Sequence, residues 1–126
     1  MTDVSNEKMC QKFLRAAAKK VRESGLARGT RLKDTGIGEG PIGSVCMLGA
    51  MDYCGVVIGY PERLRIEAHI AALLPPRPRG EDGTDKWNGA GYEWEASSRT
   101  IAWWSNMRAE TAEDVAAKFE LAAETC

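Results

Sequence analysis

The apolar positions of the first 25 residues recur at spacings of three and four, which places them on one face of a helix. Charged residues fill the other faces. Ser5 can cap the start of this helix by accepting an amide hydrogen bond, and Gly25 can end it because glycine tolerates positive φ. The pattern predicts an amphipathic helix whose buried face holds Met9, Cys10, Phe13, Leu14, Ala17 and Val21.

A second apolar segment, residues 43–54 (GSVCMLGAMDYC), has no charged residue except Asp52. A helix over Val45–Cys54 would be apolar on nearly all sides, and such a helix is normally buried. Ser44 is a good N-cap residue. We therefore predict a short buried helix at the centre of the fold. Ala50 should be deeply buried, so that a bulky residue there would destabilise the protein by overpacking.

A third helix is predicted to start at Pro61, because the missing N–H of proline would have no partner in the first helical turn anyway. Apolar residues follow at four-residue spacing until Pro75-Pro76 ends the helix. Residues 56–58 have strand propensity, but three residues between glycines are too few to assign a strand. The buried face of the helix should hold Ile66, Ile70 and Leu74.

The last thirty residues predict two more helices. Ser97 or Ser98 can cap a fourth helix, with a strand over residues 100–104 as the alternative, because threonine and aromatic residues favour both. Thr111 followed by Asp114 resembles a capping box with Asp in place of the usual Glu. The final helix carries Val115, Phe119, Ala122 and Ala123 on one face.

Residues 26–43 and 75–96 are rich in glycine and proline and show no helical or strand period, which predicts two long loops. A loop as long as the second is uncommon in a compact domain and is often functional. The expected fold class is therefore mostly α. We predict one compact domain over residues 1–126, with four or five helices around the short buried central helix.

The composition supports a small helical domain. Leu, Ile, Val and Phe make up only 22 residues, a fraction typical of disordered chains, but the net charge of −1 gives no self-repulsion to hold the chain open. The missing apolar volume comes from 17 alanines, 5 methionines and 4 tryptophans. Alanine favours helices and lets them approach closely. We therefore expect closely packed helices, with a few large aromatic side chains filling the space between them.

The charge balance and the apolar runs exclude several function classes. Interspersed charges of both signs argue against a nucleic-acid binder, which needs a basic face. No apolar run approaches the ~20 residues that a membrane span requires, and the N-terminus lacks the pattern of a signal peptide. Four cysteines without a secretory signal predict reduced thiols in a cytoplasmic protein.

Three segments in this order resemble a family of short uncharacterised proteins of actinobacteria and their phages, described as a domain of unknown function. They are Leu14–Gly25, the Cys-x-x-Gly-Ala segment from Cys46 to Ala50, and Ile101–Asn106 followed by the alanine-rich Thr111–Ala123. The resemblance covers about two thirds of the chain and leaves out the 75–96 loop. It implies a small cytoplasmic protein, and it implies no activity and no catalytic residues.

A glycine motif precedes the predicted central helix. Gly38, Gly40 and Gly43 fit G-x-G-x-x-G, and with Ser44 they could hold an anion at the helix N-terminus. A dinucleotide fingerprint must also follow a buried strand, which the preceding residues do not resemble. We expect a connecting loop, with small-molecule or nucleotide binding by residues 36–44 as the alternative.

The sequence gives little support for a metal site or for a cysteine nucleophile. Cys46, Cys54 and His69 are the candidates for a metal site, but the seven residues between the cysteines match no common zinc spacing. A nucleophilic Cys46 would need His69 within hydrogen-bond reach. We expect no metal and no cofactor, with both cysteines acting as small buried apolar residues.

The aromatic residues near the second long loop are the strongest binding candidates. Trp and Tyr are enriched at binding hot spots because a rigid ring buries much area at little entropy cost. Adjacent Trp103 and Trp104 point about 100° apart on a helix, so one can pack inward while the loop or a second subunit covers the other. Core packing is the favoured interpretation of these rings, with a protein interface as the alternative. The predicted interface is Trp87, Tyr92, Trp94, Trp103 and Trp104.

These observations favour a small cytoplasmic binding protein, expected to be phage-encoded, that contacts a host protein or a second copy of itself. The residues show no catalytic constellation. The alternative is a small-molecule or nucleotide-binding protein, including an enzyme, that uses residues 36–44. A virion or assembly component would differ by forming stable oligomers.

Overall fold

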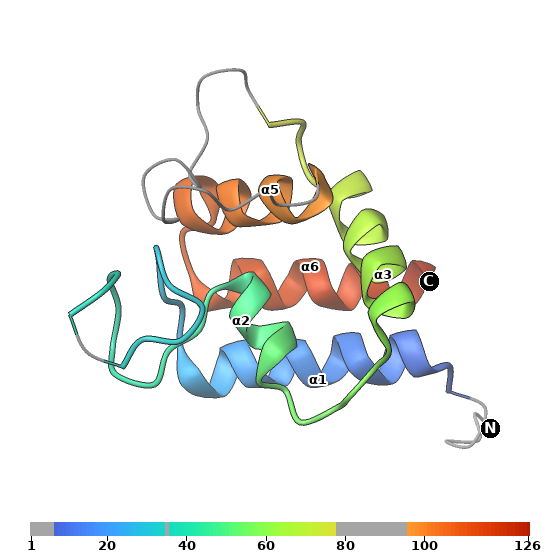
Figure 1. The fold of residues 1–126 in the computed structure, drawn as a ribbon, viewed down its shortest axis with the longest axis horizontal. Coiled ribbons are helices and arrows are strands. Elements are labelled where there is room, and N and C mark those ends of the chain that lie inside the picture. The colour runs from blue at the N-terminus through green and yellow to red at the C-terminus, as the bar shows by residue number, and fades with distance from the viewer. Residues whose placement is uncertain (1–6, 35, 78–95) are drawn as a thin grey trace.

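The computed structural model describes residues 7–34, 36–77 and 96–126, and these residues are mostly helical (Figure 1). They form no β-strand, only isolated bridges between residues 26–45. The mostly α fold class is confirmed. The elements are α1 (Met9–Ser24), α2 (Met47–Asp52), α3 (Tyr60–Ala72), α5 (Ala96–Trp103), the π-helix η2 (Trp104–Arg108) and α6 (Ala112–Thr125).

Helices α1 and α6 lie side by side and run in opposite directions (Figure 1). Most of the buried side chains between them are small, so the two backbones approach closely. Arg22 in the last turn of α1 makes two hydrogen bonds of 2.7 and 2.8 Å to Glu113 at the start of α6. Of the predicted apolar face of α1, Met9 is exposed and Cys10 is half-buried. The other predicted positions of α1 and α6 are buried: Phe13, Leu14, Ala17, Val21, Val115, Phe119, Ala122 and Ala123.

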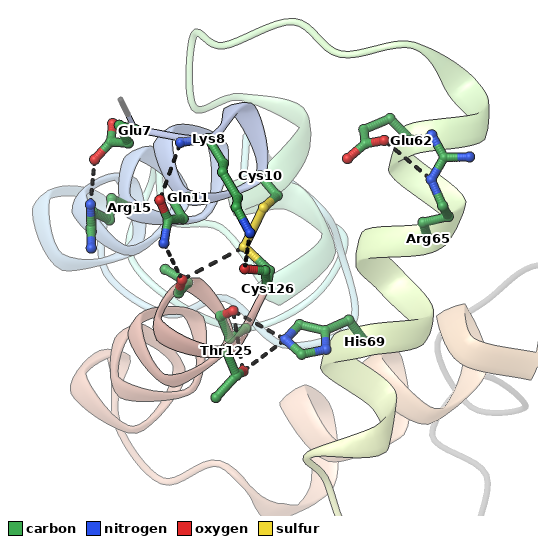
Figure 2. Close-up of a disulfide and its surroundings, with 12 residues drawn as sticks. Glu7, Lys8, Cys10, Gln11, Arg15, Glu62, Arg65, His69, Thr125 and Cys126 are labelled. Carbon is green, nitrogen blue, oxygen red and sulfur yellow. Dashed lines mark hydrogen bonds and ion pairs between the residues drawn. A yellow bond between two sulfur atoms is a disulfide. The ribbon is translucent and has the colours of Figure 1, made fainter. Parts of the chain in front are cut away.

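The opposite end of this helix pair carries a disulfide. Cys10 and Cys126 are 116 positions apart in sequence, but the antiparallel packing brings their Cα atoms to 6.5 Å and the sulfurs are bonded (Figure 2). The prediction of four reduced thiols was therefore wrong for this pair, because sequence spacing does not show which helix ends meet. Cys46 and Cys54 are free.

The α1 and α6 boundaries agree with the capping signals. Gly25, at φ +89°, ends α1 as predicted, whereas Ser5 lies outside the described residues and Lys8 precedes the helix. Thr111 accepts the amide of Asp114 at 3.1 Å, and the Asp114 carboxylate accepts the amide of Thr111 at 3.1 Å. The predicted capping box is confirmed.

The central helix is buried, as expected, but it is shorter than Val45–Cys54. It begins at Met47 with Cys46 as its N-cap, so the prediction of a Ser44 cap was wrong. The hydroxyl of Ser44 instead donates to the carbonyl of Pro41. The amide of Met47 is occupied by the hydroxyl of Ser105 at 3.0 Å, and Ala50 is fully buried.

Gly49 permits the closest backbone approach in the described chain. A Cβ at this position would overlap the carbonyl oxygen of Arg31 and lie 3.0 Å from its Cα. The helix therefore packs directly on the backbone of the 26–43 loop. That loop has no regular element, as predicted, and only isolated bridges join residues 26 and 32 to Val45.

The segment after the second loop is helical, which decides the helix-or-strand alternative for residues 100–104. Because α5 begins at Ala96, Ser97 and Ser98 lie inside the helix and do not cap it. The helix then widens into η2, where the amide of Ala109 bonds the carbonyl of Trp104 at 2.8 Å. Of the predicted 75–96 loop, residues 78–95 lie outside the described residues.

Arg28 from the first loop holds the end of η2. Its guanidinium donates to the carbonyls of Asn106 at 3.1 Å, of Ser105 at 3.4 Å and of Glu110 at 3.3 Å. The last carbonyls of a helix have no partner within it, so these bonds satisfy acceptors that would otherwise need water. The loop is thereby tied to the C-terminal half of the chain.

We predict that Gly49→Ala destabilises the protein although it improves helix propensity. Gly→Ala in a helix normally stabilises by about 0.5–1 kcal/mol, but here the added Cβ meets backbone that cannot move aside. The expected net loss is at least about 2 kcal/mol of unfolding free energy, measured by urea denaturation. Gly36→Ala is the control, because a Cβ there meets nothing within 4 Å. Equal stabilities of the two variants would refute the close-contact argument.

We also predict that Asp114 contributes to the loss of stability in acid. Its carboxylate accepts the amides of Glu110 and Thr111, and these bonds lower its pKa below the ordinary 3.8. Because the folded pKa is depressed, the stabilisation is complete above the unfolded pKa and is lost as the pH falls through the folded value. Asp114→Asn should lower Tm at neutral pH and flatten its decline below about pH 4. Glu124→Gln, an exposed change on the same helix, serves as control. An unchanged acid decline in Asp114→Asn would contradict the assignment.

Candidate functional site

The structure places the predicted aromatic interface only in part. Trp87, Tyr92 and Trp94 lie outside the described residues. Trp103 and Trp104 are 1% and 8% exposed, so both indoles belong to the core. This burial agrees with the core-packing interpretation, and an interface role for the aromatic residues stays a prediction. Because η2 widens the helix from Trp104 onward, adjacent tryptophans can both be buried.

The glycine motif packs against the loop that precedes it. A Cβ on Gly38 would lie 2.6 Å from the carbonyl oxygen of Arg28, and one on Gly40 would lie 2.9 Å from that of Leu26. Gly43 has positive φ and its surroundings are open. The glycines of residues 36–44 thus serve a close turn, as expected of a connecting loop.

The N-terminus of α2, which follows the glycine motif, is poorly suited to bind an anion. The helix α2 has only six residues. Its Met47 amide is bonded by the hydroxyl of Ser105, and the amide of Gly49 donates to the sulfur of Cys46 at 3.4 Å. Ser44, the last residue of the proposed phosphate loop, is fully buried. The geometry therefore gives no support to a phosphate site here.

Cys46, Cys54 and His69 have separate partners. Cys46 is buried at the start of α2, and burial raises the pKa of its thiol, which disfavours a nucleophilic thiolate. Cys54 donates to the carbonyl of Met51 at 3.5 Å. His69 bonds the far end of α6, at Ala122. Over residues 7–34, 36–77 and 96–126, no cluster of three or more His, Cys, Asp or Glu is placed to hold a metal ion.

A pocket of about 350 Å³ lies where α1, α2 and α3 meet the 53–59 connection. Its inner wall contains the ring of Phe13 and the side chain of Met51, both buried. At its rim Val57 is 91% exposed and Tyr60 is 68% exposed. Its lining residues are Phe13, Met51, Asp52, Val56, Val57, Ile58, Tyr60 and Arg63.

A chain of charged groups forms the polar wall of this pocket. Asp52 bonds Arg31 at 2.6 Å through one carboxylate oxygen and Arg63 at 3.0 Å through the other. Arg63 continues to Glu67 at 2.8 Å, and Glu67 accepts the hydroxyl of Ser98. Glu67 is only 6% exposed, so this network satisfies a buried carboxylate. The guanidinium of Arg63 also lies over the ring of Phe13, 5.9 Å from its centroid.

This arrangement is suited to binding. The one carboxylate and the one guanidinium among the lining residues, those of Asp52 and Arg63, are engaged with each other. The apolar floor and rim can take up an apolar side chain or a small ligand. The volume lies at the lower end of the range of ligand pockets, about 300–1,000 Å³.

Sequence reasoning missed this pocket. Residues 56–58 were too few to assign an element, and Arg31, Asp52 and Arg63 are far apart in the chain. The available signal was three β-branched residues between two glycines, which is unusual for a solvated connection. The order of these residues does not reveal which of them face water.

The comparison with protein families assigns residues 7–125 to a family of unknown function, DUF6197. This chain belongs to the DUF6197 family. The predicted resemblance to a family of unknown function is thus confirmed, over more of the chain than the three matching segments. Among curated proteins and among solved structures, no match was found for the DUF6197 protein.

The helices of the DUF6197 protein were also compared with the requirements of a membrane span. Of those in the described part of the chain, none combines the length and the apolar character that crossing a bilayer demands.

We predict that Arg63 matters to stability because of the buried carboxylate beside it. Arg63→Met keeps the side-chain length but removes the guanidinium from Glu67, which then keeps its bond from the hydroxyl of Ser98. Removing one member of a buried pair costs about 3–5 kcal/mol, and because Arg63 is partly exposed we expect about 2 kcal/mol in a denaturation experiment. Arg65→Met, which breaks the exposed pair with Glu62, should cost less than about 0.5 kcal/mol. Similar costs in both variants would show that burial of Glu67 is not the cause.

Proposed function

We propose that the DUF6197 protein is a non-catalytic binding protein that contacts a partner protein through the surface around its pocket. We define this docking surface as Val57 and Tyr60 with the pocket that they line, together with the exposed Tyr53 at the start of the same segment. The observation that carries the proposal is Val57, an aliphatic side chain that is 91% exposed beside a preformed apolar hollow.

The residue types on this surface support a protein partner. Tyrosine combines a large apolar ring with a polar hydroxyl and is enriched at the centres of interfaces. Tyr53 and Tyr60 are both exposed, at the two ends of the 53–60 segment. A ring or aliphatic side chain of a partner can enter the pocket while the tyrosines cover it. Exposed apolar residues scattered singly need no explanation, but here Val57 and Tyr60 line one cavity.

The partner class expected from the sequence is a host protein or a second copy of the chain, and it remains a prediction. The cytoplasmic location and the actinobacterial or phage origin also remain predictions. Nucleotide or small-molecule binding by residues 36–44 is the second candidate. The occupied amides at the start of α2 do not favour it.

We predict that Val57→Asp weakens partner binding without unfolding the protein. A carboxylate at this exposed position leaves the core intact but must lose its hydration when the docking surface is covered. Self-association is measured by light scattering over a concentration series, and host-protein capture by quantitative pull-down from a lysate. Either interaction should weaken at least about tenfold in the variant.

Ile42→Asp is the matched control, because Ile42 is 73% exposed and lies in the 36–44 loop, outside the pocket. It should retain every interaction of the unmodified protein. Full binding by Val57→Asp, or an equal loss in both variants, would contradict the docking surface. A wild-type protein that neither self-associates nor captures a partner would contradict the proposed function itself.

A further inference from the structure

The disulfide between Cys10 and Cys126 joins the start of α1 to the residue that follows α6. Both cysteines are half-buried, so a reagent in solution can reach the bond. Cys46 is buried and Cys54 bonds to neighbouring carbonyl groups of its own turn. The pair is thus separate from the two free thiols.

The end of α6 depends on this bond more than the rest of the helix does. The buried residues of α6 end at Ala123, and Glu124 and Thr125 are exposed. Beyond Ala123, the half-buried Cys126 is the residue that packs against the core, and it does so at the disulfide. Packing therefore holds α6 up to Ala123, whereas the disulfide holds residues 124–126.

Three residues make polar contacts around the disulfide (Figure 2). Lys8 donates to the carbonyl of Cys126 at 3.4 Å, and Gln11 donates to the carbonyl of Ala123 at 3.2 Å. His69 on α3 lies 3.1 Å from the carbonyl of Ala122 and 2.8 Å from the hydroxyl of Thr125. A carbonyl oxygen only accepts, so Nε2 of His69 carries the proton. Such exposed or half-exposed bonds are individually weak in water.

We propose that the Cys10–Cys126 pair is a reversible redox site that latches the last turn of α6 onto α1 and α3. Oxidation closes the latch. Reduction breaks the bond and releases the polar contacts of Lys8, Gln11 and His69, while the buried faces of α1 and α6 stay packed. In a reducing compartment a disulfide that forms is usually transient and redox-sensing.

The chemistry requires a dithiol reductant. A thiolate of the reductant attacks one sulfur of the Cys10–Cys126 bond, which forms a mixed disulfide and releases the other cysteine as a thiolate. The second thiol of the reductant then displaces the first cysteine. Two electrons and two protons pass to the cysteine pair, and the reductant leaves as its own disulfide.

The test follows amide hydrogen exchange of the full-length protein, oxidised and after treatment with dithiothreitol under native conditions. Exchange over residues 123–126 should rise at least about tenfold on reduction, with no change over residues 115–119. Re-oxidation should restore protection. His69 is the one histidine of the chain, so its imidazole NMR signals should move on reduction and report release of Thr125.

Variants separate the latch from other causes. Cys126→Ser should show the open exchange pattern under both conditions, and Cys54→Ser should respond as the wild type does. A bond that resists native reduction would overturn the proposal, as would a rise in exchange throughout the protein or an unchanged last turn. Failure to form the bond under mild oxidation would also overturn it. The docking surface is not involved in these measurements, so they stand or fall independently of the proposed function.

Discussion

The contact of Gly49 with the backbone of Arg31 is the constraint on which the arrangement of the molecule depends. With no Cβ in the way, α2 lies directly on the first loop. The same loop then reaches outward at two points. The side chain of Arg28 satisfies the carbonyls at the end of η2, and the side chain of Arg31 reaches Asp52 at the pocket. One close approach thus positions both the C-terminal half and the candidate site.

Polar interactions at the centre are few, and the buried indole Nε1 of Trp103 has no hydrogen-bond partner among the described residues. Ser105 is buried and its hydroxyl caps the amide of Met47, which joins η2 to α2. Glu67 is buried and is engaged by Arg63 and Ser98 from two sides. Because an unsatisfied buried group is costly, such bonds restrict how the helices can be arranged. They explain how a chain poor in large aliphatic residues can still adopt one packing.

The candidate site follows from the close packing of the helices. Alanine-rich helices pack closely, and the larger apolar residues of the 53–60 segment are left at the surface around a hollow. The redox latch lies at a different place, where the ends of α1 and α6 meet. A binding surface and a redox site can therefore act separately on the same small fold.

The sequence alone determined the helices and several of their ends. Periodicity identified the buried faces of α1 and α6, Gly25 ended the first helix, and Thr111 with Asp114 began the last. These predictions succeed because each feature depends on residues within one or two helical turns. The burial of Ala50 and the membership of a family of unknown function were likewise accessible from the residues.

Only the tertiary structure decided which distant groups meet. It paired Cys10 with Cys126, moved the cap of α2 from Ser44 to Cys46, and placed both Trp103 and Trp104 in the core. It also assembled Arg31, Asp52, Arg63 and Glu67 into one network. Each of these outcomes depends on how helices far apart in the chain pack together. Local pattern carries no information about that, because the same periodicity is compatible with many arrangements in space.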